Sequence, residues 1–167
     1  GTQLVNTASA ASVVVLTNTG AGSMTISSIS ISGTNSSNFA RTTTCVSTLA
    51  AGASCNISVT FTPSATGVRT ATLSVSDNAA GSPHTVSLSG TGVAPFATLS
   101  PTSVAFGIQG LNTTSNASTV TLTNTGTASM TISSTSVTGT NAADFTRTTT
   151  CGATLAVGDN CTFSITF

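Results

Sequence analysis

The amino-acid sequence predicts an all-β protein that contains two tandem copies of one small β-sandwich module, with one disulfide in each copy. Three observations predict this fold class: an internal repeat, short runs of alternating apolar residues, and two cysteine pairs with the same spacing. The strands are short, turn residues are frequent, and the 3.6-residue apolar period of an amphipathic helix is absent.

The repeat is the strongest feature of the sequence. Residues 1–61 align with residues 107–167 without a gap, and 37 of the 61 aligned positions are identical. Solenoid units are about 20 to 50 residues long, so an offset of 106 residues predicts whole domains in series. We expect module 1 at residues 1–92, lacking its first strand, and module 2 at residues 93–167, lacking its last strands. Two explanations stay open: a longer array of the module, or strands donated between chains.

Comparison of the two copies distinguishes inward-facing from outward-facing side chains. Val14 and Leu16 are unchanged in copy two, whereas Val13 and Val15 are replaced by Thr. The unchanged pair alternates at period two and is predicted to face the core. The same argument selects inward residues in the later strands, with Phe39 and Phe145 closing one end of the core. These residues are Met24, Ile26, Ile57, Val59 and Phe61, and in copy two Met130, Ile132, Phe163, Ile165 and Phe167.

Turn residues divide the chain into about seven strands per module. A change of parity after Ile26, toward Ile29 and Ile31, predicts a β-bulge. Residues 68–76 and 84–89 are predicted to form the last two strands of module 1, and residues 90–95 (GTGVAP) a short connection between modules. Seven short strands with frequent turns are typical of an immunoglobulin-like sandwich.

Cysteine spacing predicts two disulfides, Cys45 with Cys55 and Cys151 with Cys161. An even cysteine count in a Ser/Thr-rich chain favours disulfides and an oxidising compartment. The alternative is zinc, but the chain has a single His and cannot supply four N/S ligands in each module. We therefore expect no metal and no cofactor, and an extracellular or cell-surface location.

Composition excludes several classes of partner. Charged residues make up 4% of the chain, Lys is absent and the net charge is zero, so clustered cations for nucleic-acid phosphates or anionic membranes are missing. No apolar stretch approaches the roughly 18 residues of a membrane helix. The expected partners are neighbouring copies of the same module.

Several ordered motifs resemble a known family. SPTSVAFG, LTNTG, the cysteine pair before an ITF or VTFTP strand, PSATGVRTATLSV and VSLSGTG together resemble the choice-of-anchor D modules of bacterial surface proteins. These modules are related to the ASPM/SPD-2/hydin (ASH) immunoglobulin-like domains. The resemblance implies tandem extracellular modules with a structural or adhesive role, and it implies no catalytic residues.

Candidate reactive residues are few and scattered. His84 is the only His, and a nucleophile triad needs three converging groups, so we interpret it as a surface or edge-strand residue. Asp77, Asp144 and Asp159 are isolated and are expected to cap turns. Arg41 and Arg147 repeat and are expected to hold the disulfide loop through carbonyls or a carboxylate. The chain is therefore predicted not to be an enzyme.

The leading functional hypothesis is a fibre, filament or surface stalk. The alternative is an adhesin module that recognises glycan or protein through its loops, although the seven Phe are the only aromatics and mostly alternate into the core. Asn-x-Ser/Thr sequons mark five candidate glycosylation sites: Asn35, Asn56, Asn112, Asn116 and Asn160.

Overall fold

The structure is a computed structural model that describes residues 1–167, and the chain divides into two compact units. Unit 1 comprises Gly1–Val93 and unit 2 comprises Ala94–Phe167. Both units consist of strands and turns with one short 3-10 helix each, and neither contains an α-helix. The predicted all-β fold class is confirmed.

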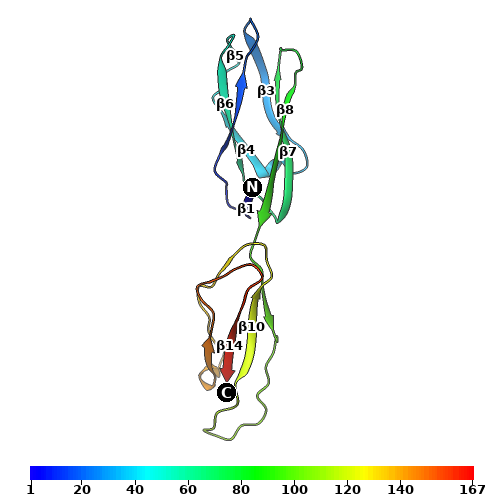
Figure 1. The fold of residues 1–167 in the computed structure, drawn as a ribbon. Coiled ribbons are helices and arrows are strands. Elements are labelled where there is room, and N and C mark those ends of the chain that lie inside the picture. The colour runs from blue at the N-terminus through cyan, green and yellow to red at the C-terminus, as the bar shows by residue number, and fades with distance from the viewer. The chain divides into compact units, whose positions relative to one another are not determined.

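Unit 1 is a sandwich of two sheets (Figure 1). One sheet has the order β1-β8-β7-β3-β5 and the other has the order β2-β6-β4. All neighbouring strands are antiparallel except β1 and β8, which are parallel. The elements are β1 (Thr2–Leu4), β2 (Ser12–Thr17), β3 (Met24–Ser32), η1 (Ser36–Asn38), β4 (Phe39–Thr43), β5 (Thr48–Leu49), β6 (Ser54–Phe61), β7 (Gly67–Asp77) and β8 (His84–Val93).

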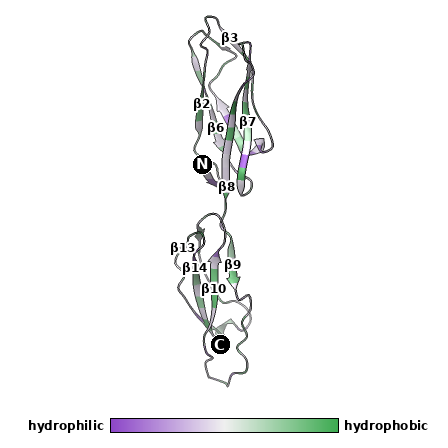
Figure 2. Cartoon of the chain, turned by 45° about the vertical axis from the view of Figure 1, so that its right-hand side comes forward, coloured by the Kyte–Doolittle hydropathy of each residue, from purple (hydrophilic) through white to green (hydrophobic).

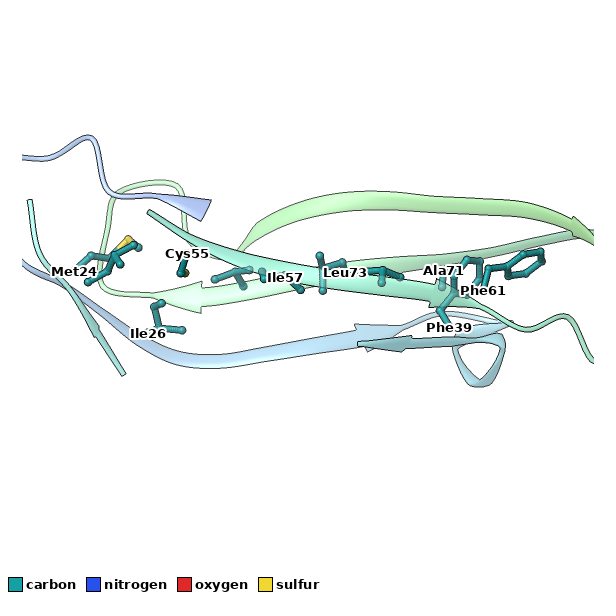
Figure 3. Packing of buried hydrophobic residues seen from close by; sticks show 11 residues of the cluster. Met24, Ile26, Phe39, Cys55, Ile57, Phe61, Ala71 and Leu73 are labelled. Carbon is teal, nitrogen blue, oxygen red and sulfur yellow. The ribbon is translucent and has the colours of Figure 1, made fainter. Parts of the chain in front are cut away.

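The core of unit 1 lies between the two sheets, as Figure 3 shows for its buried residues. Strand β6 contributes Ile57, Val59 and Phe61, and strand β7 contributes Leu73 from the opposite sheet. The rings of Phe39 and Phe61 pack with centroids 4.9 Å apart. Alternation therefore predicts the inward face of β6 correctly.

Alternation is also visible along the other strands. Val13 and Val15 are 56% and 59% exposed, whereas Val14 and Leu16 on the same strand are half-buried. Apolar and weakly polar segments follow one another along the strands in Figure 2, and strongly hydrophilic segments are few. The predicted bulge is present, because the pairing of β3 with β7 shifts between Ile26 and Ser28.

The predicted connection at residues 90–95 is wrong over Gly90–Val93, because β8 continues to Val93. Gly92 pairs with Gly67 of β7 and with Gln3 of β1. A Cβ on Gly90 would lie 2.7 Å from Cδ1 of the Phe61 ring. These glycines therefore allow close packing inside a strand instead of making a flexible joint.

Unit 2 contains a four-stranded sheet of order β12-β14-β10-β9 and a two-stranded sheet of β11 and β13. All of its paired strands are antiparallel. The elements are β9 (Ala97–Ser100), β10 (Ser118–Asn124), β11 (Met130–Thr131), η2 (Ala142–Asp144), β12 (Thr146–Thr149), β13 (Thr154–Leu155) and β14 (Asn160–Thr166).

Two predictions for unit 2 need correction. The expected strand through Met130 and Ile132 stops at Thr131, and Phe167, expected to face inward, is 37% exposed. In unit 1 the equivalent strand β3 pairs with β7 along Ile26–Ser32, and residues 94–167 contain no counterpart of β7. Without that partner the ladder cannot form, so Phe163 and Ile165 are only half-buried. They line an apolar cavity of about 300 Å³.

Candidate functional site

Each unit has one disulfide at the same place in its fold. Cys45 is joined to Cys55 with an S–S length of 2.07 Å, and Cys151 is joined to Cys161 with an S–S length of 2.04 Å. The Cα atoms are 5.0 Å apart in both pairs, and there is no free cysteine. We call residues 45–55 and 151–161 the disulfide loops.

Threonine hydroxyls hold the first residues of each disulfide loop against the following strand. In unit 1 the Thr43 hydroxyl donates to the Asn56 carbonyl and accepts from the Cys45 N–H, both at 3.0 Å. The Thr44 hydroxyl accepts from the Asn56 N–H at 3.0 Å. Thr149 and Thr150 make the same three bonds in unit 2. The repeated TTTC motif is thus explained by backbone groups that its hydroxyls satisfy.

A buried asparagine joins each disulfide loop to the turn at the end of β2 in unit 1 and of β10 in unit 2. In unit 1, Asn18 is 5% exposed, and its side-chain nitrogen donates to the carbonyls of Gly22 at 2.8 Å and Leu49 at 2.9 Å. Its side-chain oxygen accepts from the Gly20 N–H at 3.0 Å. Its backbone carbonyl accepts from the Gly52 N–H at 2.8 Å. Both polar atoms of the amide are satisfied, as burial demands.

Unit 2 rebuilds this centre with the equivalent residue. Asn124 is 0% exposed, and its side-chain nitrogen donates to the carbonyls of Ala128 at 2.9 Å and Leu155 at 3.0 Å. Its oxygen accepts from the Gly126 N–H at 3.0 Å. The predictions from the sequence did not include this buried amide. The signal was present, because Asn18, Thr19 and Gly20 are all identical in the second copy.

The two repeated arginines have different surroundings. Nη2 of Arg147 donates to the carbonyl of Thr135, whereas Arg41 lies exposed on β4. The expectation that Arg147 holds the disulfide loop is wrong, although its partner is a carbonyl. That carbonyl belongs to the segment after β11 and not to the disulfide loop.

Asp77 and His84 lie together at the turn between β7 and β8. Oδ1 of Asp77 accepts from the Ala79 N–H at 2.8 Å, and Oδ2 lies 3.6 Å from Nε2 of His84. The Asp77 side chain is buried and the His84 side chain is 45% exposed. The turn role of Asp77 was predicted, but its proximity to His84 was not. Asp144 and Asp159 are exposed.

The five sequon asparagines differ in exposure. Asn56, Asn112, Asn116 and Asn160 are exposed, whereas Asn35 is half-buried. The side-chain oxygen of Asn35 accepts from the Thr70 N–H at 3.0 Å, which fixes this side chain against β7. The four exposed asparagines are therefore sterically better placed for an attached glycan than Asn35.

No group of three or more His, Cys, Asp or Glu side chains lies close enough together to bind a metal ion. The structure also has no helix with the length and apolarity needed to cross a membrane. The polar centres that recur in both units are the two corners formed by a disulfide loop, its threonines and the buried asparagine. Their groups are all engaged in hydrogen bonds within the unit, so they brace the fold.

Among solved structures, the secreted serine protease VesC from Vibrio cholerae is similar at 13% identity and a TM-score of 0.44, over 99% of this chain and 44% of VesC. The chain thus spans less than half the length of VesC. No curated protein matches the sequence.

A family model matches most of unit 1. The matched residues are 3–91, which is more than half of the chain, and the model describes the HYDIN/CFA65/VesB-like, Ig-like domain. The match includes the first disulfide, the buried Asn18 and every strand of the unit from β2 to β7. The chain therefore belongs to the HYDIN/CFA65/VesB-like Ig-like domain family.

Proposed function

We propose that the chain is a non-catalytic extracellular structural repeat protein that forms a fibre, a filament or a surface stalk from tandem immunoglobulin-like modules. The observation that carries this proposal is the identical corner in both units. Asn18 and Asn124 make matching bonds, and each corner lies beside one disulfide. The chain repeats the elements that brace each unit, and it repeats no cluster of reactive side chains. This arrangement suits a mechanical role.

The disulfides support the extracellular location. Disulfides persist in secreted and surface proteins and are rare in reducing compartments. All four cysteines of this chain are paired. In an oxidising medium these bonds would also limit how far each unit extends when it is pulled.

The surface supports contacts between copies. The net charge is zero, so electrostatic repulsion between neighbouring modules is weak. Apolar side chains such as Val13, Val15, Val46 and Val68 are more than half exposed on unit 1. We therefore propose that the partners are further copies of the module, joined in one chain or assembled as a homopolymer. Within the matched family, we propose that these modules are of the choice-of-anchor D type.

Denaturing mass analysis of reduced native material tests this proposal, together with electron micrographs of the same sample. We expect elongated particles and a mass well above the 16.2 kDa of these 167 residues if the modules are joined in one chain. A homopolymer would give elongated particles with a mass near 16.2 kDa. Compact single particles of that mass would contradict both forms of the proposal.

A further inference from the structure

In unit 2, a segment earlier in the sequence covers the outer edge of strand β10. Strand β9 pairs antiparallel with β10, so that Leu99 lies opposite Leu122 and Ala97 opposite Asn124. The chain before β9 is held as well, because the Thr125 N–H donates to the Phe96 carbonyl at 2.8 Å. Strand β10 therefore has a partner on both sides, β9 and β14.

The equivalent edge in unit 1 has no partner. Strand β2, which aligns with β10, is the terminal strand of the sheet β2-β6-β4. Strand β1 does not replace β9, because Thr2–Leu4 aligns with residues 108–110 and pairs with β8 of the other sheet. An unpaired edge exposes backbone donors and acceptors to which another strand can bind.

A repeated glycine points to the same missing segment. A Cβ on Gly126 in unit 2 would meet the Phe96 nitrogen, and it would lie 2.6 Å from the Ala94 carbonyl oxygen. Gly126 is thus required by the close approach of the chain before β9. In unit 1 the identical Gly20 meets only the side-chain oxygen of Asn18, at 3.2 Å. The space that an approaching backbone would occupy is therefore kept open at Gly20.

A cavity beside β2 matches the end of that segment. In unit 2 the ring of Phe106 packs on Phe145 and Phe167, with centroids 5.8 and 6.1 Å apart. The counterparts of these two rings are Phe39 and Phe61. Both line a cavity of about 300 Å³ in unit 1, together with Val14, Val59 and Leu88. Six apolar and five Ser or Thr residues line it, and the apolar part of the lining suits one aromatic side chain.

We propose that the free edge of β2 and the adjoining cavity form an acceptor site for an extended segment with the chemistry of residues 97–106, supplied by another copy of the repeat. This inference rests on the proposed function, in which copies follow or assemble with one another. The alignment sets the register: Ala97 of the incoming copy lies opposite Asn18, and Leu99 lies opposite Leu16. The ring equivalent to Phe106 fills the cavity.

A covalent extension of the full chain tests the site at high effective concentration. The sequence of residues 94–106 (APFATLSPTSVAF) is added ahead of Gly1, where the repeat would place it. We expect the solvent-exposed amides of β2 to exchange with deuterium at least tenfold more slowly than in the unextended chain. The amides of β7 and β8 serve as internal references, because they already pair with each other.

Two control extensions separate pairing from a general effect of added length. A scrambled extension, and one carrying the equivalent of Phe106→Asp, are each expected to lose at least three quarters of the protection. The folded chain itself is unchanged in both, so misfolding of unit 1 cannot explain a loss. Gly20→Val is expected to abolish protection, and Gly22→Val, whose Cβ would meet no atom within 4 Å, to preserve it.

Equal protection from the native and scrambled extensions, or none from the native one, would overturn the proposal. These outcomes are distinguishable from failure of the proposed function, which is decided by the mass and shape of native material and not by exchange at β2.

Discussion

The side-chain nitrogen of Asn124 donates a 3.0 Å hydrogen bond to the carbonyl oxygen of Leu155, 31 residues further along the chain. Asn18 makes the same bond to Leu49 in unit 1. In both units this bond links the turn after a long strand to the disulfide loop. The loop is therefore fixed at its sulfur atoms and again at a buried amide.

Replacing Asn18 by Ala is expected to destabilise unit 1 by roughly 2 kcal/mol or more. The substitution leaves the Leu49 carbonyl and the Gly20 N–H without their partners, and an unsatisfied buried polar group costs about 1–3 kcal/mol. Native-state hydrogen exchange at β6 measures the loss. Asn56→Thr is the matched control, because Asn56 is exposed and unit 2 has Thr at this position. Equal losses in the two variants would contradict the role of Asn18.

Reducing the disulfides is expected to lower the stability of each unit by roughly 2–3 kcal/mol. The cysteines of each pair are 10 residues apart, and closing a loop of this length restricts the unfolded chain by about that amount. Urea unfolding with and without a phosphine reductant measures the difference. The double variant Cys45→Ala/Cys55→Ala should reproduce the loss in unit 1 without reductant. An unchanged midpoint in both experiments would show that the sulfur bridges do not stabilise the fold.

Gly92→Ala is expected to destabilise unit 1 by about 1–3 kcal/mol. The new Cβ would meet the Ala65 carbonyl oxygen and lie 2.9 Å from Cβ of Pro63, so the backbone would have to move. Gly22→Ala meets no atom within 4 Å and should change stability by less than about 0.5 kcal/mol. Thermal unfolding of both variants tests whether Gly92 belongs to a packed strand. Similar midpoints would support a flexible connection at this position.

Asp77→Ala is expected to loosen the turn between β7 and β8 by about 1 kcal/mol. The substitution removes the acceptor of the Ala79 N–H and leaves His84 without its neighbouring carboxylate. Amide exchange at residues 78–84 should become several-fold faster, while exchange at β6 stays unchanged. Asp144→Ala is the control, because Asp144 is exposed. Unaltered exchange in the Asp77 variant would show that this carboxylate does not hold the turn.

Much of unit 1 was predictable because its strands are buried on one face. Burial at Ile57, Val59 and Phe61 alternates with outward polar residues, and this period is a direct record of strand geometry. The bulge after Ile26 was predictable for the same reason, because an inserted residue shifts the period.

The remaining errors arise where a residue's role depends on a partner distant in sequence. Gly90 and Gly92 have the composition of a linker, but Phe61 and β1 make them part of a strand. Ile132 lies in the same SMTISS motif as Ile26, yet it lies outside any strand because unit 2 has no counterpart of β7. The asparagine centre was missed because a turn motif does not reveal which carbonyls its amide will reach.

Single-molecule stretching of native material tests the central claim most directly, namely that the protein is a series of disulfide-braced structural modules. We expect a row of unfolding steps of equal length under oxidising conditions. After reduction each step should lengthen by about 30 Å, because the 10-residue span between paired cysteines, at roughly 3.4 Å per residue, is released from a Cα separation of 5.0 Å. Steps of unchanged length after reduction, or one isolated step per molecule, would contradict the account.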